Sequence, residues 1–403
     1  MKAEHTKNII TEGSKLDQSN LEPSDFNSHL KIGYDGKRAA NNLTGLGNYS
    51  RSLIESLSNC YPNNRYLVYT PKVKTHQQIN SFFEKENIQL KLPRSGRLLW
   101  RSLNIVRDLL GDGVQLYHGL SHEIPLYIQH TPIRSVVTIH DLIFFRFPQY
   151  FKYIDRKIYE WKSKSACTRA DKIIAISEKT KADIIEFYGI APEKIEVIYQ
   201  SCDESFKSPF PESRLNEIKS KYNLPEKYLL NVGTIESRKN LKLIVQSLKD
   251  IDQSYKLVVI GKQTDYFKEV SEEINKLGLK ERIIFLNNIP FADLPAIYQL
   301  AKLFIYPSFY EGFGIPIIEA LYSKIPVIAA TGSCLEEAGG PNSLYVSPTN
   351  PDELSQAINQ VLNQPALQEE MKTKGLEFVQ KFNSPLVTQQ LLNCYLNVLA
   401  KPI

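Results

Sequence analysis

Two glutamates, Glu311 and Glu319, flank a glycine- and proline-containing turn, and their carboxylates are suited to binding hydroxyl groups. The turn reads EGFGIPIIE and follows the apolar segment 303–306. Its proline suits the first turn of a helix, and Gly312 and Gly314 let a ligand approach the backbone at the helix N-terminus, which favours phosphate. Vicinal hydroxyls of a sugar or a ribose are natural partners for the two carboxylates. An ordinary glycine turn with two helix-favouring glutamates fits the same spacing equally well.

Two adjacent cations, Arg238 and Lys239, follow the apolar segment 227–232 and stand where a helical pattern begins. Cations beside a helix N-terminus are unfavourable for the helix because that end carries partial positive charge. A diphosphate would neutralise them, with the arginine forking onto oxygens and the lysine acting as a point charge. The ordinary alternative is a solvated Arg-Lys pair on a loop.

Three further motifs lie in the first half of the chain. Gly45 and Gly47 precede a helical pattern, where the backbone could approach a phosphate, although a plain helix-entry turn is an equal alternative. His140 ends an apolar segment, and a lone histidine there is by default structural, with Asp141 fixing its tautomer or capping the next loop. Ser177 has the pattern of a helix N-cap.

Taken together, these motifs resemble glycosyltransferase family 4. EGFGIPIIEA is close to the EGFGxPxxEA pattern of that family, and VGTIESRKN and TIHD have counterparts in it. The resemblance implies that Glu311 contacts the donor-sugar hydroxyls, that Glu319 contacts the ribose, and that the backbone of Phe313 and Gly314 approaches the sugar and its phosphates. Many relatives carry an arginine directly after the glycine of the second motif, where this chain has Thr234.

The resemblance also assigns roles to the remaining motifs. Arg238 and Lys239 become the clamp on the donor diphosphate, and His140 a contact to the donor sugar that orients or polarises it. The implied catalytic residues are His140, Glu311, Arg238 and Lys239, and the implied donor-binding residues are Gly45, Gly47, Arg238, Lys239, Gly312, Phe313, Gly314 and Glu319.

The reaction that the resemblance implies retains the anomeric configuration, because the acceptor attacks on the face that the diphosphate leaves. No carboxylate suited to act as the nucleophile of a retaining glycosidase can be identified. Asp250 and Asp252 form the DxD pattern of metal-dependent glycosyltransferases, but they stand between a helical pattern and a strand, at the expected amino end of that strand. We interpret them as a solvated turn, so no metal is expected, and no cofactor besides the nucleotide-sugar substrate.

The elements that must position these residues alternate between apolar strands and helical patterns. Strands are expected at 30–34, 66–70, 114–118, 135–140, 172–176 and 195–199, and again at 227–232, 256–260, 282–286, 303–306 and 325–329. Such alternation predicts an α/β protein with parallel sheets and helices on both faces. With the resemblance, it predicts a GT-B fold: two doubly wound, Rossmann-like domains that face each other across a cleft.

The expected domain boundaries follow the breaks in this alternation. A disordered leader covers 1–28, an N-terminal acceptor-side domain covers 29–205, a linker covers 206–225, a nucleotide-sugar-binding domain covers 226–384 and a helix that packs on a domain covers 385–403. A chain of 403 residues is long enough for two domains.

Composition and charge limit the partners and the compartment. A net charge of +5 is too small to imply a nucleic-acid partner, and no segment is apolar enough to cross a membrane. Five widely spaced cysteines and the lack of a signal-peptide pattern favour the cytoplasm. The basic segment 91–107 could form an interfacial helix at the inner face of the membrane, although a core-facing helix with a basic solvent side is the favoured alternative.

The proposed substrate follows from the resemblance to bacterial mannosyltransferases of cell-surface glycans, carried by TIHDLIFFRFPQYF and VGTIESRKNL. We expect GDP-mannose as the donor and a glycan or a lipid-linked glycan as the acceptor. The alternatives are a UDP-sugar donor, a nucleotide-sugar epimerase with the same fold, and a non-catalytic partner subunit.

Overall fold

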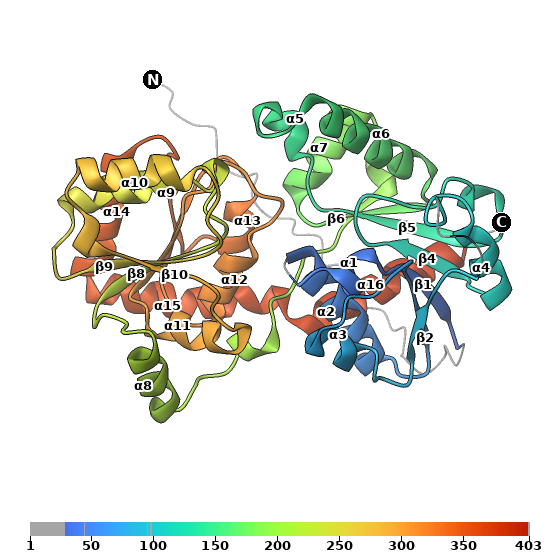
Figure 1. The fold of residues 1–403 in the computed structure, drawn as a ribbon, viewed down its shortest axis with the longest axis horizontal. Coiled ribbons are helices and arrows are strands. Elements are labelled where there is room, and N and C mark those ends of the chain that lie inside the picture. The colour runs from blue at the N-terminus through green and yellow to red at the C-terminus, as the bar shows by residue number, and fades with distance from the viewer. Residues whose placement is uncertain (1–28, 44, 95, 97–98, 402–403) are drawn as a thin grey trace, which may run out of the picture.

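The computed structural model describes residues 29–43, 45–94, 96 and 99–401. The leader predicted over 1–28 lies outside the described residues. Two parallel sheets with helices on both faces make up the described part, and they stand side by side (Figure 1). The prediction of two doubly wound α/β domains is therefore confirmed.

The first sheet has seven parallel strands in the order β3-β2-β1-β4-β5-β6-β7. Its strands are short apolar runs, such as RSVVTI, that are buried on both faces, as expected for a sheet covered by helices on both sides. The strands are β1 (Lys31–Asp35), β2 (Arg65–Tyr69), β3 (Ile88–Lys91), β4 (Leu116–Gly119), β5 (Arg134–Ile139), β6 (Lys172–Ala175) and β7 (Ile195–Val197).

The second sheet has six parallel strands in the order β10-β9-β8-β11-β12-β13. Its central strands β8 and β11 precede the two motifs that carry Arg238 and Glu311. The strands are β8 (Tyr228–Val232), β9 (Lys256–Ile260), β10 (Ile283–Leu286), β11 (Leu303–Tyr306), β12 (Val327–Ala330) and β13 (Leu344–Val346).

Local sequence signals explain several helix boundaries. Ser177 accepts a hydrogen bond from the N–H of Thr180 and caps α7, which confirms its predicted role, and Gly189 ends that helix in the left-handed conformation. Asn350 caps α14 in the same way. The helices are α1 (Lys37–Asn41), α2 (Gly45–Cys60), α3 (Gln77–Phe82), α4 (Ile105–Asp112), α5 (Ile143–Arg146), α6 (Tyr153–Arg169), α7 (Glu178–Tyr188), α8 (Glu212–Lys221), α9 (Leu241–Ser247), α10 (Phe267–Lys276), α11 (Leu294–Leu300), α12 (Ile315–Tyr322), α13 (Leu335–Gly339), α14 (Pro351–Asn363), α15 (Pro365–Val379) and α16 (Ser384–Leu399).

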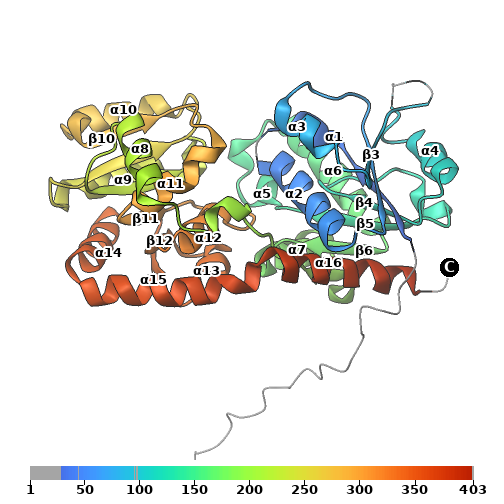
Figure 2. The same ribbon diagram turned by 90° about the horizontal axis from the view of Figure 1, so that it is seen from below.

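The C-terminal helix α16 returns to the first domain. Figure 2 shows α15 beneath the second sheet and α16 continuing beneath the first. Leu391 and Tyr395 join the core around β1 and α2, and the Tyr395 hydroxyl lies 2.6 Å from Nδ1 of the buried His118. The last helix therefore ties the two domains together. The predicted linker 206–225 contains α8, which packs on α11 of the second domain.

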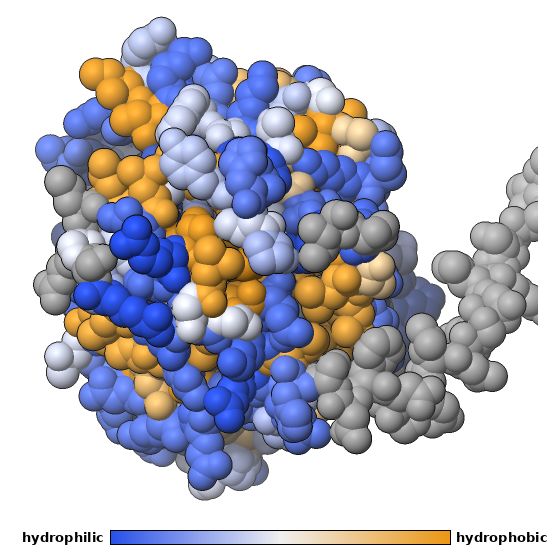
Figure 3. Space-filling view, turned by 90° about the vertical axis from the view of Figure 1, so that its right-hand side faces the viewer, coloured by the Kyte–Doolittle hydropathy of each residue, from blue (hydrophilic) through white to orange (hydrophobic). Residues whose placement is uncertain are grey.

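The basic segment 91–107 does not form one interfacial helix. β3 ends at Lys91, and α4 begins only at Ile105. Trp100 is buried and its indole N–H donates to Asp108 (2.7 Å), while Arg101 pairs with Asp35 (2.7 Å). Figure 3 views this end of the molecule and shows apolar atoms in separate patches among hydrophilic ones. The described residues of 91–107 therefore do not form the single expected helix, because Trp100 fills the core, whereas membrane contact by this segment stays a prediction.

Candidate active site

A cavity of about 700 Å³ lies between the two domains, where loops after the carboxyl ends of their strands meet. The first domain contributes Gly45 and His140, and the second contributes Arg238, Lys239 and the loop around Glu311. Ligands of open parallel sheets bind at this edge. The structure therefore gathers the motifs from both halves of the chain around one cleft.

The centre of the cleft wall is an ion cluster around Glu311. One carboxylate oxygen lies 2.7 Å from Nη1 of Arg238, and the other lies 2.9 Å from Nζ of Lys239. The two cations belong to a 3₁₀ turn (Ser237–Lys239) after β8, and Glu311 follows β11, the neighbouring strand. The presumed sugar-binding carboxylate and the presumed diphosphate clamp are thus bonded to each other.

Opposite charge outweighs desolvation in this cluster. Burial alone would raise the pKa of Glu311, but Lys239 and Arg238 lower it to about 2. Burial alone would lower the pKa values of Arg238 and Lys239, but Glu311 raises both above their ordinary values. All three groups are therefore charged at neutral pH.

Two residues that the sequence motifs did not single out complete the cluster. The Tyr306 hydroxyl accepts from Nζ of Lys239 (2.6 Å) and donates to Glu311 (3.0 Å). Glu236 accepts a bond of 2.6 Å from Arg238. The signal for Tyr306 is its place at the very end of a buried strand that leads directly into the EGFG loop.

The glycine loop after Glu311 is built for close contact with the first domain. A Cβ at Gly312 would stand 2.1 Å from the carbonyl oxygen of His140, so only glycine fits. Gly314 precedes α12 with φ of 134°, which glycine adopts without strain. Phe313 is buried and its ring stacks on Tyr199, so its side chain points away from the cavity centre into the core.

The second glutamate of the motif, Glu319, has a different environment. It lies inside α12, is buried, and accepts one hydrogen bond from the Tyr298 hydroxyl (2.9 Å). Burial raises its pKa to about 7, although the bond from Tyr298 acts in the opposite direction. Glu319 lines the same cavity as Glu311, but no cation among the described residues pairs with it.

His140 lines the first-domain side of the cavity with both ring nitrogens bonded. Nε2 lies 2.8 Å from the carbonyl oxygen of Leu120, and this carbonyl can only accept, so Nε2 carries the proton. Nδ1 then accepts from the Gln200 amide (3.2 Å). Burial, with His122 as a second cause, lowers the pKa of His140 to about 4. The imidazole is therefore neutral and fixed. Asp141 caps the next loop by accepting from the N–H of Ile143 (3.1 Å).

The two glycines of the first domain have different surroundings. Gly45 opens α2, lines the cavity and has open space where a Cβ would stand. Gly47 lies two residues further into α2, and a Cβ there would stand 1.8 Å from the carbonyl oxygen of Asn42. Gly47 is not among the residues that line the cavity, and close packing against the preceding loop explains its lack of a side chain.

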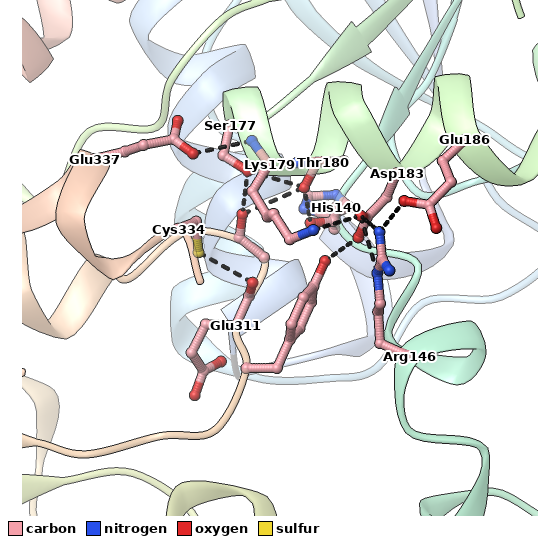
Figure 4. Close-up of polar contacts among 12 residues, drawn as sticks. His140, Arg146, Ser177, Lys179, Thr180, Asp183, Glu186, Glu311, Cys334 and Glu337 are labelled. Atoms are coloured by element: carbon pink, nitrogen blue, oxygen red, sulfur yellow. Dashed lines mark hydrogen bonds and ion pairs between the residues drawn. The ribbon is translucent and has the colours of Figure 1, made fainter. Parts of the chain in front are cut away.

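A network of hydrogen bonds joins the two domains beside the cavity (Figure 4). Ser177 donates to the carbonyl of Gly312 (2.7 Å), and the carboxylate of Glu337 accepts from the N–H groups of Glu178 and Lys179 (2.7 and 2.9 Å). A carboxylate from the second domain thus meets the positive end of α7 in the first. Sequence motifs gave no sign of this contact, because it joins residues that are far apart in the chain.

A buried aspartate forms a second part of this network. Asp183 is fully buried and pairs with Arg146 (2.7 Å) and Lys179 (2.8 Å). Tyr310 directly precedes Glu311 in the chain, and its hydroxyl donates to the same carboxylate. The position of Glu311 is therefore coupled to the contact between the domains.

The DxD pattern lies away from the cleft. Asp250 ends a 3₁₀ turn and Asp252 stands before the amino end of β9, and neither lines the cavity. Within the described ranges, no group of three or more His, Cys, Asp or Glu side chains is arranged to hold a metal ion. In the same part of the chain, no helix has the length and apolar character needed to cross a bilayer.

The chain is similar to known glycosyltransferases in both of its halves. The profile of glycosyltransferase family 4 matches residues 44–206, and that of glycosyl transferases group 1 matches residues 214–378. O-antigen chain mannosyltransferase B of Escherichia coli is 26% identical over 88% of this chain and 96% of its own length. An O-antigen chain mannosyltransferase of Salmonella typhimurium is 31% identical over 60% of this chain and 63% of its own.

Solved structures agree with the fold. A sucrose-phosphate synthase of Thermosynechococcus elongatus superimposes with a TM-score of 0.74 at 22% identity, covering 92% of this chain and 99% of that one. HepE of Anabaena, solved with UDP and glucose, superimposes with a TM-score of 0.73 at 18% identity, covering 92% and 100%. The chain has the GT-B fold and belongs to glycosyltransferase family 4.

Proposed function

We propose that this enzyme transfers mannose from GDP-mannose to a glycan acceptor during the synthesis of a cell-surface polysaccharide, with retention of configuration and without a metal ion. The observation that carries the proposal is the convergence of Arg238 and Lys239 on Glu311 in the inter-domain cleft. The O-antigen mannosyltransferases among its relatives support the choice of sugar.

In this mechanism the bond between the anomeric carbon and the diphosphate oxygen breaks while the acceptor oxygen bonds to the same face of that carbon. The acceptor proton passes to the departing diphosphate. Arg238 and Lys239 stabilise the charge that develops on the leaving group, which requires no ion beyond the two side chains. When the donor binds, Arg238 and Lys239 bond to the diphosphate in place of Glu311, and the Glu311 carboxylate accepts hydrogen bonds from hydroxyls of the donor sugar.

Glu319 is the proposed partner of the ribose hydroxyls, because it lines the cavity. Tyr298 donates to one of its carboxylate oxygens, and the other oxygen is the proposed acceptor for the ribose. His140 is the proposed contact to the donor sugar. Since both its ring nitrogens are bonded and the imidazole is neutral, it acts by position and not as a base.

The test is calorimetric binding of GDP-mannose, UDP-glucose and UDP-N-acetylglucosamine, with and without EDTA. Selective, EDTA-insensitive binding of GDP-mannose supports the proposal. Preference for a UDP-sugar keeps the enzyme class and refutes the mannose assignment, and no binding to any donor favours a non-catalytic subunit. Anomer-resolved NMR of the product then tests retention, and an epimerised donor without an acceptor would identify an epimerase.

We also propose that α6 makes a peripheral contact with the membrane. The first turns of α6 expose Tyr153, Ile154 and Trp161 by 66%, 71% and 59%. The exposed Lys152 and Lys164 accompany them. Aromatic and apolar side chains beside lysines are typical of a helix at the surface of an anionic bilayer.

A further inference from the structure

A second cavity, of about 570 Å³, lies on the first domain and is lined by basic side chains. Five cations and two amides contribute to its wall: Lys37, Arg38, Lys72, Lys74 and Arg101, with Asn41 and Asn42. None of the described residues that line it is an aspartate or a glutamate. The cavity therefore has a strongly positive interior.

The backbone around this cavity is fixed before any ligand arrives. The amide of Asn41 and the hydroxyl of Thr70 both donate to the carbonyl of Lys72 (2.9 and 2.7 Å). The N–H of Lys74 donates to the carbonyl of Ala40 (3.0 Å). These bonds hold the loop after β2 against α1, so the cations of both segments stand together in one arrangement.

The charges on this wall are poorly compensated by the protein. Arg101 pairs with Asp35 (2.7 Å) and lies 3.6 Å from Glu123. For the other four cations, no carboxylate of the described residues lies within ion-pair distance, and Nε of Arg38 is buried without a hydrogen-bond partner. Burial and the neighbouring Arg101 lower the pKa of Lys37. Cations gathered without counter-ions are favourable only when an anion neutralises them.

The basic cavity adjoins the donor cleft. Asn42 and Leu43 line the basic cavity, while Gly45 and Leu46 line the cleft. Arg38 lies close enough to act electrostatically on His140, which lines the cleft. A ligand with a hydroxyl in the cleft and an anionic group in the basic cavity would occupy both.

We infer that the basic cavity binds a phosphate or diphosphate group of the acceptor, so that the enzyme glycosylates a phosphorylated saccharide. This inference rests on the proposed function, because it names the acceptor of the same cleft. The donor diphosphate already has its own cations, Arg238 and Lys239, on the opposite domain. The second set of cations therefore serves a second anionic group.

The experiment compares two pairs of acceptors at saturating GDP-mannose. Mannose 1-phosphate is compared with methyl mannoside, and a short-chain prenyl diphosphate mannoside with the corresponding prenyl mannoside. In the wild type, we expect kcat/KM to be at least tenfold higher for the phosphorylated member of a pair. An advantage within both pairs identifies the phosphate alone as the ligand, and an advantage confined to the second pair identifies a lipid-linked diphosphate. Equal kcat/KM within both pairs would overturn the inference.

The variant to test is Lys72→Gln combined with Lys74→Gln, because both lysines stand on the loop after β2. We expect the advantage of the phosphorylated acceptor to fall at least tenfold, through KM and not kcat, because a hydrogen bond to a charged group contributes about 1.5–3 kcal/mol. Lys268→Gln, an exposed lysine on α10 of the second domain, is the matched control and keeps the advantage. An undiminished advantage in the double variant would refute the site.

Donor binding separates this inference from the proposed function. The double variant binds GDP-mannose as the wild type does, because neither lysine lines the donor cleft. If the wild type bound no donor, the proposed function would fail, and the cavity is then tested by calorimetric titration with inorganic pyrophosphate. Binding that the double variant loses supports an anion site, and binding that it keeps refutes one.

Discussion

Glu311→Gln tests whether this carboxylate holds the diphosphate clamp in the empty enzyme. The substitution keeps the size of the side chain and removes its charge. Arg238 then keeps Glu236 and the carbonyl of Tyr310, while Lys239 keeps only the Tyr306 hydroxyl. Two largely buried cations are left with a neutral amide between them, so we expect the folded state to be destabilised and the affinity for an added anion to rise.

The size of the effect follows from the environment of the three groups. Their side chains are 13–18% exposed, so the cluster is buried but not dry. The lowering of the Glu311 pKa from 4.5 to about 2 corresponds to about 3 kcal/mol, and breaking a buried ion pair costs about 3–5 kcal/mol. We expect a loss of about 2–4 kcal/mol. Because the pKa is lowered, this stabilisation is complete above pH 4.5 and is lost only as the pH falls towards 2, so the deficit should be constant from pH 5 to 9.

Thermal unfolding with and without GDP is the assay. We expect the melting temperature of Glu311→Gln to lie roughly 5–10 °C below that of the wild type, and GDP to raise it more in the variant than in the wild type, since the diphosphate replaces the missing charge. Glu236→Gln is the matched control. Glu236 bonds to Arg238 alone and is 37% exposed, so its loss should cost less than about 1 kcal/mol. An equal GDP shift in wild type and Glu311→Gln would refute the competition between Glu311 and phosphate.

Three further predictions follow from other parts of the molecule. Burial raises the pKa of Glu319, so the folded protein holds a proton that the unfolded chain releases, and stability falls by up to about 3 kcal/mol as the pH rises from 4.5 through 7. Urea unfolding at pH 5 and pH 8 should show that Glu319→Gln removes this fall. Tyr310→Phe removes a hydrogen bond from the buried Asp183 and should cost about 1–3 kcal/mol, with a larger radius of gyration by small-angle scattering if the domains open. Trp161→Ser should abolish sedimentation with anionic liposomes at low salt, whereas Leu386→Ser, which removes an exposed apolar side chain of α16, should not.

The sequence patterns predict all the inner strands but only two of the four edge strands, β7 and β10. The apolar segments 256–260 and 303–306 coincide with β9 and β11, which are buried on both faces. β3 and β13 stand at the edges of their sheets, are three or four residues long and are half-exposed, so no continuous apolar run marks them. These two strands form because they pair with β2 and β12, and a local sequence pattern does not reveal such pairing.

The same limit applies to the site. The positions of Arg238 and Glu311 at the same edge of one sheet could be predicted, because parallel strands place their carboxyl ends at one edge. The direct bond between them could not, since the order of strands in the sheet is not written in local sequence. Gly47 shows the opposite case: its motif suggests a ligand, but the nearby carbonyl of Asn42 already requires a glycine there.

The loop from Tyr310 to Gly314 is the point at which the domain contact and the chemistry meet. Within it, Tyr310 bonds to the first domain through its hydroxyl and to Arg238 through its carbonyl. The carbonyl of Gly312 is held by Ser177 of the first domain, and Gly312 packs against the backbone of His140. A separation of the domains must therefore break bonds on both sides of Glu311. Since Glu311 also holds Arg238 and Lys239, domain closure and the arrangement of the cationic clamp are set by the same few residues.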